Sequence, residues 1–453
     1  MAEDHRELRL RELTKGLPLE VRPTGYGGDG VFASSAIEAD FVIFSDVPSC
    51  WLPEPAMTHP SANCTSCGAF LGTPGELLEL LAGGDPAQAL DVPEPDDGPP
   101  APRLVAGATT CGADCPRRPP AWPARPTGRI PVPKNIVVGS GEEEVQLASQ
   151  LMARLGAAAA AGDAQWRLEL DALASPPWLE VATDGDHPRL PEASLAALRA
   201  SLAADGVGAA FDAVRESELL GLWSRALGAV GRNGIWVQIP SPVVFAIAAI
   251  DEGAAAGDAS CRTRIPALAA VVERCQAAVA ARGGGATGRK RAREDEEEED
   301  EEEEGEGESE SEGEGDDGDD DEEEEDDDGD SDDSEEGGDE EVIQFRWEVS
   351  AGGGAPARTL DFDSTLFGAH KGVGVFPLLS KLNHACEPNC MPLWRRDNCV
   401  QLVATRALPP GTELTIDYLG DMVPRDAARR RRAWLQEQYG FVCSCVRCVA
   451  SDT

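Results

Sequence analysis

The sequence has no hydrophobic run of the roughly 18 to 20 residues that a membrane-spanning helix needs. Its first residues, MAEDHRELRLRELTKG, are charged where a secretory signal peptide would be apolar. We therefore expect an intracellular protein without membrane contacts. Aromatic residues are scarce at 5% of the chain, with only three tyrosines, so a tyrosine that stands inside a motif is informative.

Basic residues are missing from one long segment. Residues 294–341 hold 36 of the 83 Asp and Glu residues and neither Lys nor Arg. The other 47 acidic residues face 39 basic ones, so the formal net charge of -44 falls to an ordinary -8 outside the segment. The length of 453 residues and 41% hydrophobic content allow one large domain with insertions, or about two to three smaller domains. A fibrous or wholly disordered chain is excluded.

The tract from 283 to 341 has too few apolar residues to offset the entropy of ordering a chain, so we expect it to be disordered. Two interpretations of its acidic part stay open. It is a solvated insertion, or its carboxylates attract basic partners such as histone tails. The basic residues at 289–293 are either a nuclear import signal, which favours the nucleus over the cytoplasm, or a patch that pairs with the acidic run.

Short strands and helices alternate along the rest of the chain. β-Branched and aromatic residues between turn residues predict strands within 19–47, at 234–239 and in several segments after 342. Apolar residues spaced three and four apart predict helices between 142 and 230, and a further helix is predicted at 262–282. A later basic helix carries four arginines at 429–432, which contact a substrate or simply solvate that face.

Thirteen cysteines in a reducing compartment are not expected to form disulfides, so closely spaced cysteines are read as metal ligands or buried thiols. Cys443, Cys445 and Cys448 follow a C-x-C-x2-C spacing. This spacing is too tight for relaxed mutual disulfides, and it suits one tetrahedral zinc ion with a distant fourth ligand.

Three motifs in the last eighty residues carry the strongest signal: NHACEPNC at 383–390, ELTIDY at 413–418 and YGFVCSC at 439–445. In this order and spacing they resemble the SET-domain protein-lysine methyltransferases. The segment GVFPLLS at 374–380 leads into the first motif and resembles the SET and MYND (SMYD-like) group within them. The resemblance covers residues 20–48 and 230–448, interrupted by insertions.

The resemblance implies an α+β fold: a β-rich SET domain of small sheets with a pseudoknot, a helical insertion, a post-SET zinc site and a disordered acidic loop. The implied domains are the N-terminal part of the SET domain at 20–48, a Cys- and Pro-rich degenerate MYND-like insertion at 49–133, a helical SET insertion at 142–230, a SET segment at 231–282, the disordered basic-acidic tract at 283–341, the catalytic SET core at 342–420 and a post-SET zinc-binding segment at 421–450.

Asn383 and Tyr418 suit the chemistry of such enzymes. An Asn amide offers two donors and an acceptor, which fits the charged ends of a methionine moiety, although an Asn-His pair alone indicates only a turn with a satisfied histidine. Methyl transfer from a sulfonium needs a neutral lysine amine in line with the methyl group, and desolvation in a narrow channel lowers a lysine pKa. The resemblance makes Tyr418 the catalytic residue, whereas a single tyrosine at a strand end is more often a packed core residue.

S-Adenosylmethionine and structural zinc are the cofactors that the resemblance implies. The implied cofactor-binding residues are Gly28, Asp29, Gly30, Asn233, Ser380, Leu382, Asn383, His384, Tyr418, Tyr439 and Phe441. Asp29 departs from the family pattern, because relatives often carry Asn there. The implied fourth zinc ligand, beside Cys443, Cys445 and Cys448, is Cys386, and a site of four cysteines leaves no open position for catalysis.

A second set of closely spaced cysteines lies in the irregular stretch at 49–133: Cys64, Cys67, Cys111 and Cys115. They occupy the place where relatives insert a MYND zinc module. A full module needs eight ligands for two zinc ions, and the later cysteines and histidines are missing here. These four residues are therefore less certain ligands for at most one zinc ion, with Cys50 and His59 as stand-ins.

The implied function is transfer of a methyl group from S-adenosylmethionine to a lysine side chain of a protein. Acidity and an import signal favour a histone as substrate, which is an analogy. The alternative is a catalytically weak SET protein that acts as an acidic histone-binding scaffold. Intact Asn383, His384 and Tyr418 argue against this alternative, and Asp29 and the shortened MYND region argue for it. No sequence-specific nucleic-acid binding is expected, and the acceptor lysine, the number of methyl groups and the oligomeric state stay open.

Overall fold

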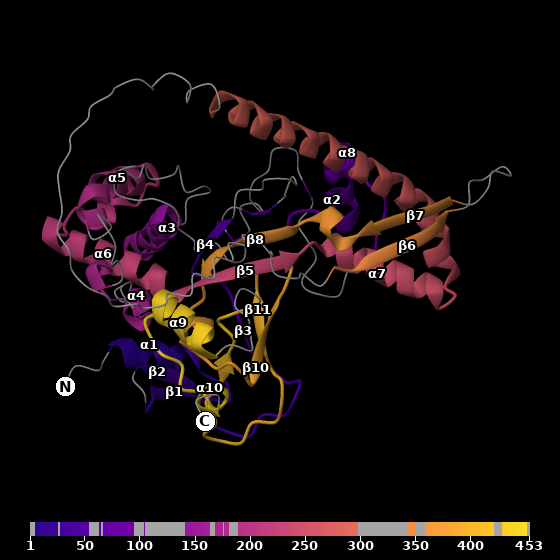
Figure 1. Ribbon diagram of the computed structural model, residues 1–453. Helices are drawn as coiled ribbons and strands as arrows, with labels where there is room; N and C mark the ends of the chain where they lie inside the picture. The colour runs from indigo at the N-terminus through magenta and orange to yellow at the C-terminus, as the bar shows by residue number, and fades with distance from the viewer. Residues whose placement is uncertain are drawn as a thin grey trace, which may run out of the picture.

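The computed structural model describes residues 5–25, 28–53, 63–64, 67–94, 104, 141–163, 168–174, 176–180, 189–297, 342–349, 358–420 and 428–450. Figure 1 shows small sheets between two groups of helices. No helix in these ranges is both long and apolar enough to cross a membrane. The predicted α+β class with small sheets is confirmed.

Two of the sheets contain the N-terminal strands predicted within 19–47. Strand β1 (Leu19–Pro23) pairs with β2 (Asp29–Ala33) in an antiparallel hairpin. The other sheet has the order β10-β11-β3, with β3 (Val42–Asp46) against β11 (Val400–Ala404) and β10 (Cys390–Trp394) at its edge. The start of the chain is thus joined to residues more than 350 positions later, since Asp46 pairs with Val400 and Val42 with Val403.

A third sheet also joins distant segments, in the order β4-β8-β5. Strand β8 (Ala369–Val375) lies between β4 (Cys50–Pro53) and β5 (Gly234–Pro240) and pairs antiparallel with both. Strands β6 (Gln344–Val349) and β7 (Arg358–Asp363) form a separate hairpin. Alternate residues of β6 are buried, as the two-residue period of a half-buried strand requires.

The predicted helical part between 142 and 230 has a hydrophobic core of its own. It comprises α3 (Gly141–Ala160), α4 (Leu168–Ala172), α5 (Leu190–Ala204) and α6 (Glu216–Asn233). Apolar residues spaced three and four apart along these helices face one another in a single buried cluster. Inside the cluster the indole nitrogen of Trp223 donates to Ser194 Oγ at 2.9 Å, so the one polar group of this large side chain is satisfied.

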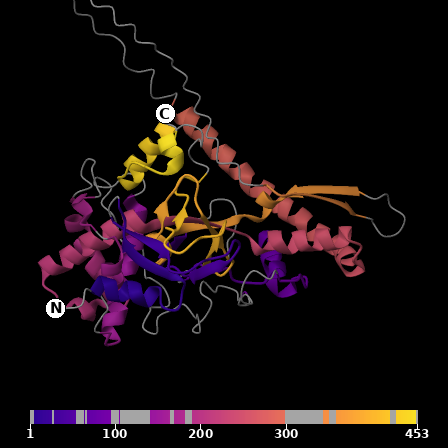
Figure 2. The same ribbon diagram turned by 90° about the horizontal axis from the view of Figure 1, so that it is seen from below.

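On the other side of the sheets lie α2 (Pro74–Leu81), α7 (Pro242–Ala255), α8 (Ala259–Glu297) and the β6–β7 hairpin, and Figure 2 shows the same division from below. Helix α2 begins with a capping box formed by Thr73 and Glu76. Arg274 of α8 binds both carboxylate oxygens of Glu79 in α2, at 2.7 and 3.0 Å. This bidentate pair joins the cysteine-rich insertion to α8.

Helix α8 corrects one predicted boundary. The helix continues to Glu297, so residues 283–297, which were assigned to the disordered tract, are helical here. The glycines at 283–285 and 288 disfavour a helix, but alanine, arginine and glutamate after them favour one, and extending a helix that is already formed costs far less than starting one. The rest of the tract, residues 298–341, lies outside the described residues.

Three more helices complete the fold: α1 (His5–Leu13), α9 (Ala428–Tyr439) and α10 (Val446–Ala450). Helix α1 packs against α4, and α9 and α10 follow the SET core at the C-terminal end. Short 3-10 helices lie at η1 (Pro86–Gln88), η2 (Trp178–Glu180), η4 (Gly208–Phe211), η5 (Ser364–Phe367) and η6 (Leu379–Lys381).

Candidate active site and metal centre

A parallel strand pair brings two of the three C-terminal motifs together. Strand β9 (Asn383–His384) lies beside β12 (Thr415–Ile416), with Asn383 opposite Thr415 and His384 opposite Ile416. Strand β2 joins them, because the Leu414 amide donates to the Val31 carbonyl at 2.8 Å. Strand β2, which follows the glycine-rich turn, therefore lies beside the parallel pair.

Asn383, Glu413 and the backbone at 29–30 form a cradle at this junction. The amide nitrogen of Asn383 donates to the Asp29 carbonyl at 3.0 Å and to Glu413 Oε1 at 2.8 Å. A Cβ atom at Gly30 would lie 2.6 Å from Glu413 Oε1 and 3.1 Å from the Asn383 amide nitrogen, so the cradle requires glycine. Both hydrogens of the Asn383 amide serve the protein itself, and its oxygen is the group that remains for a ligand.

Ser380 and Leu382 lie just before Asn383. The hydroxyl oxygen of Ser380 is buried and has no hydrogen-bond partner in the described part of the chain. Leu382 is fully buried, and its carbonyl accepts a hydrogen bond from the Tyr418 hydroxyl. A buried hydroxyl without a partner is unusual, and a polar ligand would satisfy it.

Tyr418 lies in a group of aromatic rings that also includes Tyr439, Phe441 and Trp434. The Tyr418 ring centroid is 4.8 Å from that of Tyr439 and 6.4 Å from that of Phe441, and Trp434 lies 5.8 Å from Tyr439. Burial raises the pKa of the Tyr418 phenol, and the nearby Tyr439 and Glu413 raise it further. The phenol is therefore neutral, its hydrogen points to Leu382, and its oxygen keeps the capacity to accept.

His384 connects Tyr418 to the cysteines. The Tyr418 amide donates to His384 Nδ1 at 3.1 Å, and Nε2 lies 3.3 Å from Cys386 Sγ. Burial, together with the charge of Arg431, lowers the pKa of the imidazole to about 4, so the ring is neutral. Because Nδ1 accepts, the single ring hydrogen is on Nε2 and points to the Cys386 sulfur.

Cys386, Cys443, Cys445 and Cys448 form a metal-ligand cluster. Their four sulfur atoms all lie within 4.8 Å of one another, and no other group of three or more His, Cys, Asp or Glu ligands in the described ranges is comparably close. No disulfide joins the described cysteines. Four converging thiols are the donor set of a closed structural zinc site, so the residues fit this ion. The predicted set of four ligands is brought together.

Three of the thiols, those of Cys386, Cys443 and Cys445, differ in how readily they ionise. Burial raises the pKa of Cys386, and it raises that of Cys443 to about 11. Burial opposes ionisation of Cys445 as well, but hydrogen bonds from the Cys448 and Cys386 backbone and side-chain hydrogen bonds lower its pKa to about 7. A metal ion binds thiolates, so Cys445 is the ligand closest to its binding form.

The arginine run at 429–432 turns partly inward. Arg431 is 1% exposed, and its Nη2 lies 3.5 Å from Cys448 Sγ. Arg432 donates to the carbonyls of Cys443 at 3.0 Å and Cys448 at 3.2 Å. For Arg431 the interpretation as part of a solvated face is wrong, because the side chain is buried; substrate contact by the arginine run stays a prediction.

Two predicted cofactor residues lie in structural positions. Asn233 ends α6, and its amide nitrogen donates to the carbonyls of Ala174 at 2.7 Å and Ala229 at 2.6 Å. Gly28 adopts a positive φ of 73° in the turn before β2, and nothing lies near the place of its missing Cβ. Their contact with a cofactor stays a prediction.

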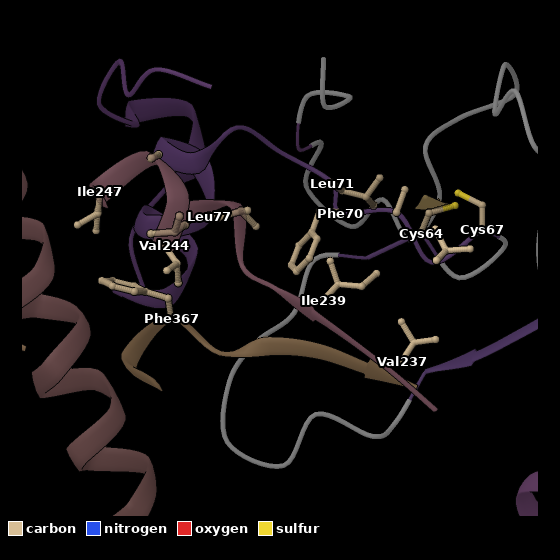
Figure 3. Close-up of a cluster of buried hydrophobic side chains, with 14 of the residues drawn as sticks. Cys64, Cys67, Phe70, Leu71, Leu77, Val237, Ile239, Val244, Ile247 and Phe367 are labelled. Atoms are coloured by element: carbon tan, nitrogen blue, oxygen red, sulfur yellow. The ribbon is translucent and has the colours of Figure 1, made fainter. Parts of the chain in front are cut away.

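The N-terminal cysteines lie in hydrophobic surroundings. Cys64 and Cys67 are buried in the main core cluster, and Figure 3 shows them at one end of it, with Phe70 between them and Leu77. Cys50 packs in the separate core of the helical part. Three of the residues considered as N-terminal ligands lie outside the described ranges: Cys111, Cys115 and His59.

The SET domain family matches residues 287–419, which include Asn383, His384 and Tyr418. This chain carries a SET domain. The match ends one residue after Tyr418, so the cysteines at 443–448 lie beyond it. The resemblance to the SET-domain methyltransferases is confirmed.

Curated relatives match about 18% of the chain. "Histone-lysine N-methyltransferase SMYD3" of Mus musculus is 43% identical over 81 residues, which is 18% of each chain. "Protein-lysine N-trimethyltransferase SMYD5" of Danio rerio is 39% identical over 82 residues, 18% of this chain and 20% of the relative. "Histone-lysine N-methyltransferase ATXR2" of Arabidopsis thaliana is 35% identical over 86 residues, 18% and 17% of the two chains. The SET domain is SMYD-like, and the chain spans about a fifth of the length of the curated relatives it matches.

Three residues of the SET domain and the segment that follows it were missed as site residues. The sequence analysis named Glu413 only as the first residue of the ELTIDY motif, although a carboxylate next to a predicted cofactor site indicates a site residue. Trp434 had no signal except its place five residues before Tyr439. Arg431 was hidden inside a run of four arginines, because sequence does not tell which of them is buried.

Proposed function

We propose that the SET domain transfers a methyl group from S-adenosylmethionine to a lysine side chain of a protein, with Tyr418 as the catalytic residue. The observation that supports it most is the position of the Tyr418 phenol. It is neutral, tied to the Leu382 carbonyl, and packed against Tyr439 and Phe441 where β12 ends. The overall activity of SET-domain relatives supports the same reaction class.

The cradle and Ser380 fit the methionine end of the cofactor. S-Adenosylmethionine supplies an electrophilic methyl group on a sulfonium. The Asn383 oxygen and the Asp29 carbonyl are acceptors for an ammonium group, and the Glu413 carboxylate adds negative charge beside them. Ser380 Oγ, buried and without a partner among the described residues, is the further polar contact. His384 and Phe441, 6.3 Å apart, would flank the adenine.

The aromatic group prepares the acceptor amine. A wall of aromatic rings removes water from a lysine side chain, and the loss of hydration lowers the pKa of the lysine, which leaves the neutral amine that can attack the methyl carbon. The Tyr418 oxygen accepts a hydrogen bond from that amine because its own hydrogen is occupied by Leu382. Tyr418 therefore orients the nucleophile and does not remove its proton.

The metal centre is structural in this proposal. Four cysteines would hold a zinc ion, which has no open position for substrate or water. The centre fixes the segment from Tyr439 to Cys448 against the Asn-His motif through Cys386, and so holds Tyr439 and Phe441 beside Tyr418. Without the metal centre, Tyr439 and Phe441 would no longer be held beside Tyr418.

A histone is the substrate that we propose. The acidic tract would raise the local concentration of a lysine-rich tail, an effect that weakens with salt. Two of the relatives carry "histone-lysine" in their names. The basic residues at 289–293, interpreted as a nuclear import signal, favour a nuclear location. The proposal also includes an intracellular location. It further includes zinc at the N-terminal cysteines.

The second candidate is a weakly catalytic scaffold that binds histones through its acidic tract. One observation favours it, because both Asn383 hydrogens are bound within the protein; the family resemblance adds that Asp29 stands where relatives often carry Asn. Deleting residues 294–341 separates the candidates. An enzyme with a docking loop loses histone binding and retains methyl transfer to a free peptide, whereas a scaffold loses its only measurable activity.

The deciding experiment is transfer of a labelled methyl group to core histones and to a total protein extract, for the natural protein and for Tyr418→Phe. We expect label on lysine and a loss on the order of 100-fold or more in the variant, because one positioned group at the reacting centre is removed. Calorimetric binding of S-adenosylmethionine is the control, since the variant should still bind it. If the folded natural protein binds no cofactor, the proposal is wrong.

A further inference from the structure

Helix α9 presents four consecutive arginines in two different environments. Arg429 and Arg430 are exposed, Arg432 is half-buried, and Arg431 is 1% exposed. A fully buried arginine is rare unless it is paired, because removing a guanidinium from water is costly. The surroundings of Arg431 must therefore supply negative charge.

Arg431 lies next to the cysteine cluster, whose thiols become negative thiolates when they bind a metal ion. Its Nη2 donates toward Cys448 Sγ at 3.5 Å, and Cys386 Sγ lies 3.4 Å from Cys448 Sγ. The guanidinium also contacts the thiol of Cys386, and an arginine side chain stays protonated in proteins. Arg431 therefore remains a cation in contact with two of the four predicted ligands.

Arg432 fixes the other side of the same loop. It donates from Nε to the Cys443 carbonyl at 3.0 Å and from Nη2 to the Cys448 carbonyl at 3.2 Å. These two carbonyls belong to the first and last cysteines of the C-x-C-x2-C segment. Arg432 thus sets the span of the loop, and Arg431 lies next to the sulfur atoms that the loop presents.

Four thiolates around one divalent zinc ion carry formally two negative charges, which are costly to bury. A cation inside hydrogen-bond distance offsets part of that charge, and an arginine does so with a fixed planar group. We propose that Arg431 is the built-in counter-charge of the four-cysteine metal centre and that it raises the affinity of the centre for zinc. The inference rests on the proposed metal centre and adds a positioning residue to it.

The test is zinc affinity of the full-length chain, measured by competition with a chromophoric chelator. Arg431→Gln should bind zinc about 10- to 100-fold more weakly, the usual effect of losing an outer partner of a metal ligand. Arg430→Gln is the matched control: it removes the same charge from the adjacent, exposed position of the same helix and should change the affinity by no more than about twofold. Arg431→Lys should recover part of the loss.

A second readout reports on the sulfur atoms themselves. With cobalt in place of zinc, the thiolate-to-metal absorption bands should shift in Arg431→Gln and not in Arg430→Gln, because only the first change removes a hydrogen bond to a ligand. A loss of stability alone would not move these bands. Equal affinities and equal spectra for the two glutamine variants would overturn the role of Arg431.

Failure of the metal centre and failure of the arginine role give different results. If the natural protein binds neither zinc nor cobalt, the centre itself is wrong, and with it the role of Arg431. If the natural protein binds zinc and both glutamine variants bind it equally, only the arginine role fails. If Arg431→Gln is unfolded as isolated, recovery of its circular dichroism in excess zinc supports the role by mass action, and no recovery overturns it.

Discussion

The two cysteine-rich regions of this protein differ in how their ligands come together. In the C-terminal region, four sulfur atoms from two distant segments lie within 4.8 Å of one another. In the N-terminal region, Cys64 and Cys67 are buried among hydrophobic residues, and no third ligand comes close enough among the residues that the structure describes. Both regions contain a short Cys-x2-Cys spacing, but only in the C-terminal region do the sulfur atoms converge on one site.

Each region also has a buried histidine, and the two histidines differ in their partners. Both ring nitrogens of His384 are engaged, one with the Tyr418 amide and one with the Cys386 sulfur. His370 lies against Trp51 and Phe70, and Asn63 contacts its Nδ1 at 2.6 Å, while Nε2 has no partner within the described ranges. His384 therefore connects the cysteines to the aromatic group, whereas His370 is part of a hydrophobic packing arrangement.

The largest effect on zinc content and methyl transfer is expected when one cysteine is replaced in each region and the two variants are compared. Cys443→Ser should abolish zinc binding at the C-terminal centre and lower methyl transfer on the order of 100-fold or more, since losing even an outer partner of a ligand costs about 10- to 100-fold in affinity or activity. Cys64→Ser should leave that zinc in place. Metal content by mass spectrometry and the methyl-transfer assay measure both. Equal zinc loss in the two variants would contradict the comparison.

A methyl group at Gly68 should break the N-terminal packing. Its φ is +73°, and a Cβ there would lie 2.2 Å from the Asn398 amide nitrogen and 2.8 Å from Trp51 Nε1. Gly68→Ala should lower the free energy of unfolding by about 3 kcal/mol, from backbone strain and overpacking together. Gly83→Ala is the control, with a similar φ of +72° and no close neighbour, and should cost about 1–2 kcal/mol. Denaturant titration compares them, and equal losses would contradict the packing argument.

Replacing Gly30 by alanine should weaken cofactor binding more than it lowers the stability of the fold. Here the added methyl group would press on Glu413 and the Asn383 amide, which form the cradle. We expect Gly30→Ala to weaken S-adenosylmethionine binding by about 1–3 kcal/mol, the usual cost of overpacking, without loss of zinc. Gly25→Ala serves as control, because nothing lies within 4 Å of its missing Cβ. Calorimetry that gave the same affinity for both variants would remove the cradle from the cofactor site.

The smallest effect concerns acid stability. Burial lowers the pKa of His370 from 6.5 to about 4 in the folded protein. Between these values the unfolded chain takes up the proton and the folded one does not, so the stability present above pH 6.5 is lost as the pH falls toward 4. From about pH 7 to about pH 5 the loss attributable to His370 is on the order of 2 kcal/mol.

Unfolding in urea at both pH values, for the natural protein and for His370→Gln, isolates this contribution. Other groups, including His384 and the acidic tract, titrate equally in the two proteins, so the difference between the two pH dependences belongs to His370. If both proteins lose the same stability, His370 is not held neutral by burial.

Much of the fold followed from the sequence, and the misses have physical causes. The strand predicted at 234–239 is β5, because this segment is rich in β-branched and aromatic residues. The helices predicted between 142 and 230 are present, because their apolar residues show a clear helical period. Helix α7 was missed because its run VVFAIAAI is apolar without a period, although Ser241 caps it and Pro242 occupies its first turn. Strand β10 was missed because it contains Pro392, which is tolerated there since β10 is at the sheet edge.

The sequence by itself determined the residue types of the site. It supplied the Asn-His motif, Tyr418 and the C-x-C-x2-C spacing, because motifs of a few residues depend only on local chain geometry. A distant fourth ligand followed from the tetrahedral preference of zinc, and the family resemblance pointed to Cys386.

Only the tertiary structure decided which partners these side chains contact. It turned the Asn383 hydrogens onto Asp29 and Glu413, placed Arg431 against the Cys448 sulfur, and left Cys64 and Cys67 in a hydrophobic core. Helical periodicity tells that Arg431 and Leu435 share a face of α9, but not that this face is the buried one. That choice depends on which distant segment packs against the helix, and the contact is set by the whole core, not by local spacing.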